Sequence, residues 1–139
     1  MTIETTPSLL MNGNEKEYID LLKKEYNQKI IKIPEGKNVV FFLNKDEDCR
    51  HFFCGKGGTK MNKLRCKYIL FIKYILENKD CRVVKQHKIT KNVIFVCNDP
   101  KFIIVCSDIG NNNLKCFTYH PYKDIVDFLD QNKYIDYIF

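Results

Sequence analysis

The sequence predicts a single α+β domain in which helices pack on one face of an antiparallel sheet of four to five strands. Two observations support this fold class. Apolar residues in the first half of the chain recur every three or four positions, whereas those in the second half form short runs separated by turns. The short loops between these runs favour antiparallel hairpins over parallel crossovers. A length of 139 residues fits one domain and is too short for two ordinary ones.

Three segments of the first half have the features of helices. Asn14 is a good N-cap for a helix that ends before Pro34. Residues 49–59 predict a short helix or turn that breaks at its glycines. After Thr59, apolar residues from position 61 to 75 repeat at helical spacing and predict one long helix. The polar residues 1–13 predict a flexible tail, which leaves residues 14–139 as the domain.

Short apolar runs bounded by turn residues predict the strands. These runs are residues 38–44, 82–86, 92–98, 101–107 and 114–120. Pro121 then opens an amphipathic closing helix over 121–130. The last six residues, 134–139, are mostly apolar. This C-terminal tail is expected to dock a protein partner, to self-associate or to pack on its own core.

The positive charge is concentrated in the middle of the chain. The net charge is +6, but residues 50–91 hold twelve Lys and Arg against two acidic residues, and each flank carries a net charge of −2. Such a block favours RNA or another polyanion as a partner, held through its phosphates, although a solvated helix face is the alternative interpretation. The predicted nucleic-acid-binding residues are Arg50, Lys60, Lys63, Arg65, Lys67, Arg82, Lys85 and Lys88.

The cysteines and the chain ends bear on the compartment and on metal binding. The seven cysteines are odd in number and most lie in apolar runs, which favours free thiols in a reducing compartment. Cys49 and Cys54 lack the close spacing of zinc ligands, so neither a metal nor a cofactor is predicted. No secretory signal and no membrane-spanning segment is recognised, which predicts an intracellular, cytoplasmic protein.

Two further features bear on phosphate chemistry. Two of the three histidines, His51 and His87, lie in the basic segment, and His120 ends the last predicted strand. A pair of imidazoles near lysines suits metal-independent RNA cleavage, in which one removes a 2′-hydroxyl proton and the other protonates the leaving oxygen. The glycine-rich residues 55–60 are either a phosphate-binding nest or a linker.

Three local features resemble the barnase, EndoU, colicin and RelE group of small ribonucleases. They are His51 in Arg-His-Phe-Phe-Cys-Gly, the basic helical segment, and a last strand that ends Phe-Thr-Tyr-His-Pro, within residues 46–121. The resemblance implies one or two helices before a four-stranded antiparallel meander, as in toxin or phage-associated members. It also implies a metal-independent ribonuclease that uses His51, Lys56, Thr118 and His120 around the scissile phosphate.

A different class of protein remains as the alternative. In that interpretation the chain is a non-enzymatic viral or phage protein that inhibits or redirects a host nucleic-acid enzyme. The apolar C-terminal tail would then contact the protein partner.

Overall fold

The computed structural model describes residues 9–10, 13–54, 60–122 and 132–139, and these form one α+β domain. In chain order the elements are α1 (Glu15–Tyr26), β1 (Ile30–Lys32), β2 (Asn38–Val40), α2 (Asp46–Cys54), α3 (Lys63–Lys67), α4 (Phe71–Glu77), the 3-10 helix η2 (Lys79–Cys81), β3 (Arg82–His87), β4 (Val93–Asn98), β5 (Lys101–Gly110), β6 (Asn113–Pro121) and β7 (Tyr134–Asp136). The predicted α+β class is therefore confirmed.

The sheet is larger than predicted and it is mixed. Its seven strands lie in the order β1-β2-β6-β5-β4-β3-β7. The four hairpin-linked strands β3 to β6 form the predicted antiparallel meander. The prediction of a purely antiparallel sheet is wrong because β2 pairs in parallel with β6. The edge strands β1 and β7 were not predicted, because each has only three residues.

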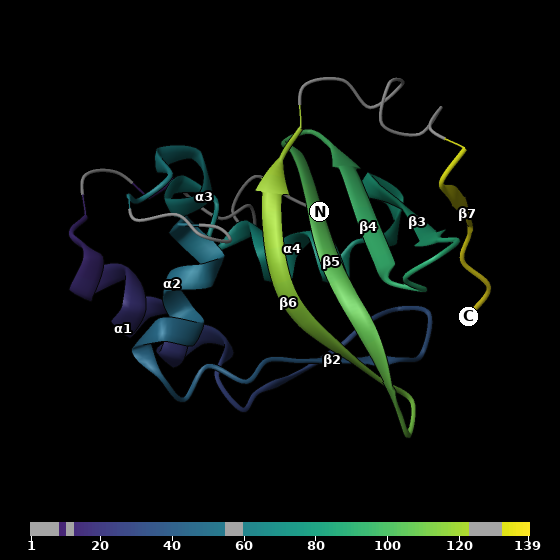
Figure 1. Ribbon diagram of the computed structural model, residues 1–139, viewed down its shortest axis with the longest axis horizontal. Coiled ribbons are helices and arrows are strands. Elements are labelled where there is room, and N and C mark those ends of the chain that lie inside the picture. The colour runs from purple at the N-terminus through teal and green to yellow at the C-terminus, as the bar shows by residue number, and fades with distance from the viewer. Residues whose placement is uncertain (1–8, 11–12, 55–59, 123–131) are drawn as a thin grey trace.

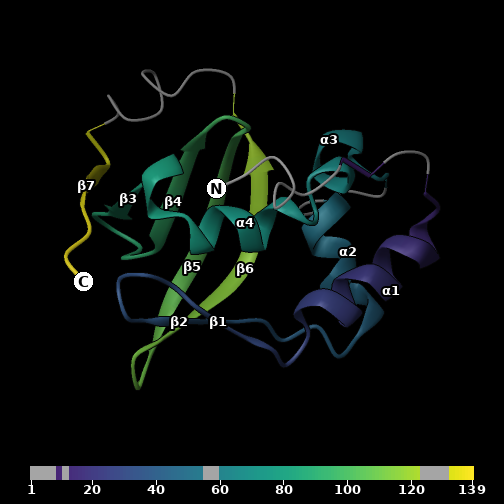
Figure 2. The same ribbon diagram turned by 180° about the vertical axis from the view of Figure 1, so that it is seen from behind.

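The prediction that the helices pack on one face of the sheet is met only in part: the described helices share one core with the sheet, but they form two groups. Figure 2 shows α4 lying across one face of the meander, between the viewer and the strands. The helices α1, α2 and α3 instead gather beside β6, at one end of the molecule (Figure 1). The domain thus has a helical end beside β6 and a sheet end at β3 and β7.

The first predicted helix is confirmed as α1. The Asn14 side chain accepts a hydrogen bond from the Glu17 N–H, and the Glu17 carboxylate accepts one from the Asn14 N–H, so both groups of a capping box are present. Its buried face carries Tyr18, Leu22 and Tyr26 into the core. Of the predicted tail before α1, Leu10 donates its N–H to the Lys67 carbonyl.

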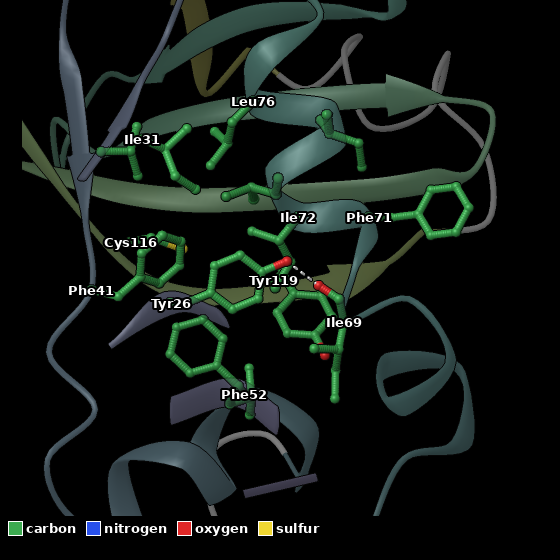
Figure 3. Close-up of a cluster of buried hydrophobic side chains, with 14 of the residues drawn as sticks. Tyr26, Ile31, Phe41, Phe52, Ile69, Phe71, Ile72, Leu76, Cys116 and Tyr119 are labelled. Carbon is green, nitrogen blue, oxygen red and sulfur yellow. Dashed lines mark hydrogen bonds between the residues drawn. The ribbon is translucent and has the colours of Figure 1, made fainter. Parts of the chain in front are cut away.

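The long helix predicted after Thr59 is broken in two, and the buried Tyr26 hydroxyl lies at the break. A continuous helix would join the Lys73 N–H to the Ile69 carbonyl. Instead, the Tyr26 hydroxyl donates to the Ile69 carbonyl and lies 3.4 Å from the Lys73 nitrogen (Figure 3). A side chain inserted into the hydrogen-bond ladder is a recognised cause of helix breaks. The apolar spacing was correct, but it did not reveal this tertiary contact.

Two apolar clusters cover the two faces of the meander. Alternate residues of β4 and β5, such as Phe95 and Ile104, belong to the main core beneath the helices (Figure 3 shows part of this core). The residues between them, such as Val96 and Ile103, form a second cluster on the opposite face. This explains why both strands are continuously apolar in sequence.

The C-terminal part of the chain is described only in part. Pro121 belongs to β6, and the rest of the predicted closing helix lies outside the described residues apart from Tyr122. Within the C-terminal tail, β7 pairs with β3, and Tyr137 packs against the main core. The tail thus adds an edge strand to its own sheet, while Ile138 stays 89% exposed.

Candidate functional site: a pocket between α2 and β6

The basic segment does not form one face of the domain. Lys60, Lys63, Arg65 and Lys67 lie in and before α3 at the helical end, whereas Lys85 and Lys88 lie in and after β3 at the sheet end (Figure 1). The strands β4 and β5 separate the two groups. The cations of residues 50–91, contiguous in the sequence, are therefore divided in space between the two ends of the domain.

Arg82 is part of the core rather than of a surface for nucleic acid. Its side chain is only 1% exposed and makes two hydrogen bonds with Glu35, at 2.6 and 2.9 Å. It also donates to the Ile75 and Leu76 carbonyls of α4, and its guanidinium lies over the Phe95 ring. The prediction that Arg82 contacts a nucleic acid is corrected accordingly: this residue fastens the β1–β2 turn and α4 to the sheet.

Other predicted cations have ion-pair partners within the chain. The Arg50 Nε lies 2.7 Å from a Glu15 carboxylate oxygen, and Lys85 pairs with Asp136. Lys60, Lys63 and Lys88 are exposed, and Lys67 is half-buried. The exposed cations of the predicted set, Lys60, Lys63 and Lys88, are thus divided between the two ends of the molecule.

A surface pocket of about 430 Å³ opens between α2 and β6. Its lining residues are Phe42, Asp48, His51, Phe52, Lys115, Cys116, Phe117 and Thr118. The pocket exists because β2 pairs with β6 only as far as Val40 and Lys115, after which the chain leaves the sheet and leads into α2. It contains two of the four residues that the resemblance implied, His51 and Thr118.

A bulge in β6 sets the direction of the residues along the pocket. Val105 faces Thr118 and Cys106 faces Cys116, so Phe117 has no partner on β5. Cys116 points into the core, while the Phe117 side chain is 37% exposed. The bulge therefore presents Phe117 and Thr118 together at the rim.

The polar groups of the pocket lie beside exposed aromatic rings. The Lys115 ammonium is 5.4 Å from the centroid of the Phe42 ring, which is 48% exposed. The exposed His51 ring has its Nε2 4.0 Å from a Glu47 carboxylate oxygen. Asp48 adds a carboxylate to the lining. The pocket thus combines an apolar surface with a cation, an imidazole and a hydrogen-bond acceptor.

His120 is not among the lining residues. It faces Ile103 across the sheet, two residues beyond Thr118, and its Nδ1 lies 3.1 Å from the Pro121 carbonyl oxygen. Burial lowers the pKa of His120 below its ordinary value of 6.5. Lys56 lies outside the described residues. Whether these two residues act with His51 stays a prediction.

Arg65 joins α3 to the helix that carries His51. Its Nη1 lies 3.5 Å from the carbonyl oxygens of His51 and Phe52, and its own carbonyl accepts a hydrogen bond from the buried Tyr119 hydroxyl, at 2.5 Å. Burial lowers the pKa of the Arg65 side chain below its ordinary value. These contacts hold the short basic helix α3 beside the α2 end of the pocket.

Burial raises the pKa of Cys116, which lines the pocket, and of the cysteines in α2 and α3, and so disfavours their thiolate forms. Burial raises the pKa of Cys49 and of Cys66 to about 11, and it also raises the pKa of Cys54. Within the described part of the chain, no cluster of three or more His, Cys, Asp or Glu side chains has the arrangement of a metal site.

Comparisons of the chain with protein-family models, with curated proteins and with solved structures found no match. The resemblance to small ribonucleases stays a prediction. In the described ranges, no helix has both the length and the apolar character needed to cross a bilayer.

Sequence reasoning missed the aromatic part of the pocket. The alternation in β6 could have revealed Lys115 and Phe117, because Leu114 and Cys116, which alternate with them along the strand, point into the core. The sequence predicts a strand over residues 38–44, but only residues 38–40 pair, and the chain beyond them exposes the Phe42 ring. Its position beside Lys115 depends on a contact between segments more than 70 residues apart.

Proposed function

We propose that the protein binds single-stranded RNA, with one nucleotide held in the pocket between α2 and β6. A pocket of about 430 Å³ lies in the usual range for a site that encloses a small ligand. The observation that supports the proposal most directly is the presence of two partly exposed rings, Phe42 and Phe117, beside Lys115 and His51. Aromatic side chains that stack on bases, together with cations for phosphates, are the usual means of binding single strands.

Each polar group of the pocket has a role in this proposal. Lys115 and His51 contact phosphate oxygens, and Asp48 accepts a hydrogen bond from a base amino group or a ribose hydroxyl. Arg65 holds α3 against α2. The exposed Lys60 and Lys63, just before α3 and at its start, attract the phosphates of the neighbouring nucleotides in the RNA. Binding is therefore expected to weaken as the salt concentration rises.

Cleavage of the bound RNA is a second candidate, favoured by the presence of His51 and Thr118 in the same pocket. His51 would act on the 2′-hydroxyl proton, and Thr118 would donate a hydrogen bond to a phosphate oxygen. His120 would need to reach the leaving oxygen to complete an acid–base pair.

Binding is measured by the fluorescence anisotropy of a labelled single-stranded RNA in EDTA, at low and at high salt. The variant Phe42→Ala/Phe117→Ala is expected to bind about 10-fold to 100-fold more weakly, because each stacked base contributes roughly 1–3 kcal/mol. Ile89→Ala removes an apolar side chain at the sheet end that is 83% exposed, more than either pocket ring, and serves as the control. Equal affinity of the double variant and the control would exclude the pocket as the binding site.

Cleavage is followed on the same samples by gel electrophoresis, with His51→Ala and His120→Ala beside the wild type. Loss of cleavage in His51→Ala supports the nuclease hypothesis. Intact RNA with the wild type leaves a binding protein, and cleavage that survives both substitutions contradicts the assignment of the histidines. An affinity that does not change with salt would contradict the role of phosphates.

A further inference from the structure

The tip of the β3–β4 hairpin presents one apolar side chain to solvent. Ile89 lies in the turn between the two strands and is 83% exposed. The hairpin belongs to the sheet end of the domain, and β4 and β5 separate β3 from β6 and its pocket (Figure 1). A single exposed aliphatic residue is ordinary on a protein surface, so the groups around it decide what it indicates.

Exposed lysines adjoin Ile89 in the folded hairpin. The Lys88 N–H donates to the Lys133 carbonyl, at 2.8 Å, which brings the residue before β7 next to the turn. The Lys91 N–H donates to the His87 carbonyl, at 2.9 Å, and closes the turn. All three lysines are exposed, and neither β3, β4 nor the turn between them contains an Asp or Glu. The tip thus combines an apolar side chain with a local excess of positive charge.

The backbone of the turn leaves no N–H group without an acceptor. His87 Nδ1 accepts hydrogen bonds from the N–H groups of Ile89 and Thr90, both at 3.1 Å. The Thr90 Oγ1 accepts one from the Asn92 N–H, at 3.2 Å. The N–H groups of the two lysines in the turn make the bonds described above. Such a tip can enter surroundings that lack hydrogen-bond acceptors without leaving a backbone donor unsatisfied.

Lys91 has a backbone conformation that favours glycine. Its φ is +64°, in the left-handed region where a β-carbon is unfavourable. A glycine would close the same turn with less strain, so the geometry of the turn does not explain a lysine here. What the lysine adds at this position is an exposed ammonium group beside the apolar tip.

We propose that the hairpin tip, residues 88–91 together with Lys133, is a docking site for an anionic phospholipid surface. Ile89 enters the boundary between headgroups and acyl chains, and the lysine ammonium groups contact the negatively charged headgroups. Asp136 of β7 does not oppose this charge, because it is paired with Lys85. A nucleic acid would also attract the lysines, but it would gain little from an aliphatic side chain, since its bases stack on aromatic rings.

The first test is cosedimentation of the folded protein with vesicles of phosphatidylserine and phosphatidylcholine in equal parts, with vesicles of phosphatidylcholine alone as the neutral reference. Binding to the anionic vesicles only is expected. Lys88→Ala/Lys91→Ala should bind about 25-fold more weakly, because each lysine near an anionic surface contributes roughly fivefold. Lys60→Ala/Lys63→Ala removes the same charge at the helical end and should bind as the wild type does. Absence of wild-type binding, or equal losses in the two double variants, would overturn the proposal.

The second test asks whether the apolar tip enters the bilayer. The chain contains no tryptophan, so Ile89→Trp introduces a single fluorophore at the tip. Its emission should move to shorter wavelength when anionic vesicles are added, because the ring leaves water. Ile138→Trp is the matched control, since Ile138 is 89% exposed and follows the opposite end of β7. Unchanged emission of the tryptophan at the tip, or the same shift in both variants, contradicts the proposal.

The third test separates the charge of Lys91 from the stability of the turn. Lys91→Gly should unfold at the same or a higher urea concentration than the wild type, because glycine tolerates the positive φ. Its affinity for anionic vesicles should fall by about fivefold. Unchanged affinity would contradict the role of this lysine. The variant Phe42→Ala/Phe117→Ala should still bind vesicles, so failure of the RNA proposal and failure of this one are distinguishable.

Discussion

Two arginines of the same basic segment, Arg65 and Arg82, serve the two ends of the molecule in different ways. At the sheet end, the nearly inaccessible Arg82 is neutralised by Glu35 and bound to two carbonyls of α4. At the helical end, the half-buried Arg65 makes two longer contacts with carbonyls of α2 and has no carboxylate partner among the described residues. The first arginine stabilises the core, and the second positions a basic helix beside an open pocket.

This comparison shows why a charge count along the chain overstates a binding surface. The count treats all twelve cations of residues 50–91 alike. A buried guanidinium with a carboxylate partner presents no charge to a phosphate, whereas an exposed lysine does. The surface available to an anionic partner is therefore set by burial and pairing, which the sequence does not report.

The largest difference is expected when each arginine is removed. Arg82→Ala should lower the free energy of unfolding by about 3–5 kcal/mol, because it leaves the Glu35 carboxylate and two carbonyls without their partner. Arg65→Ala should lower it by only about 1 kcal/mol, since its contacts are longer and reach solvent. Urea unfolding measures both, with Lys88→Ala as an exposed control. Equal losses for the two arginines would contradict the distinction between the ends.

A smaller effect is expected at the helix break between the two ends. Tyr26→Phe keeps the buried ring but removes the hydroxyl that contacts the Ile69 carbonyl and the Lys73 N–H. The free energy of unfolding should fall by about 1–3 kcal/mol, because buried polar groups lose a partner. Tyr74→Phe removes a hydroxyl from a ring that is only partly buried and is the matched control. If Tyr26→Phe is as stable as this control, the hydroxyl does not hold the break.

The smallest expected effect is a difference in acid sensitivity between the ends. Burial keeps the folded-state pKa of His120 below 6.5, so unfolding becomes easier as the pH falls below about 6.5 and the unfolded chain takes up the proton. Arg82 holds the pKa of Glu35 below 4.5, so that contribution is lost only as the pH falls below about 4.5.

These two pH windows are separated by comparing variants in urea unfolding at several pH values. His120→Gln should flatten the stability profile just below pH 6.5, and Glu35→Gln should flatten it below 4.5. A profile that neither substitution changes would show that other groups govern the acid response.

Much of the fold follows from local patterns, and much less of the site does. The cap at Asn14 and the hairpin meander of β3 to β6 were predicted because their signals lie within a few residues. His51 and Thr118 were expected to share a site, and the pocket contains both. Phe42 and Phe117 were missed because their exposure depends on where β2 leaves the sheet and on a bulge in β6.

The sequence by itself determined the α+β class, most strands of the sheet and the start of the first helix at Asn14, because periodicity, caps and turn residues act over short distances. Only the tertiary structure decided which cations face solvent, where the long helix breaks and how the pocket is formed. The Glu35–Arg82 pair and the Tyr26–Lys73 contact each join residues 47 positions apart, and the Asn38–Asn113 pair joins residues 75 positions apart. Such contacts form when distant segments pack together, and no short stretch of sequence contains both partners.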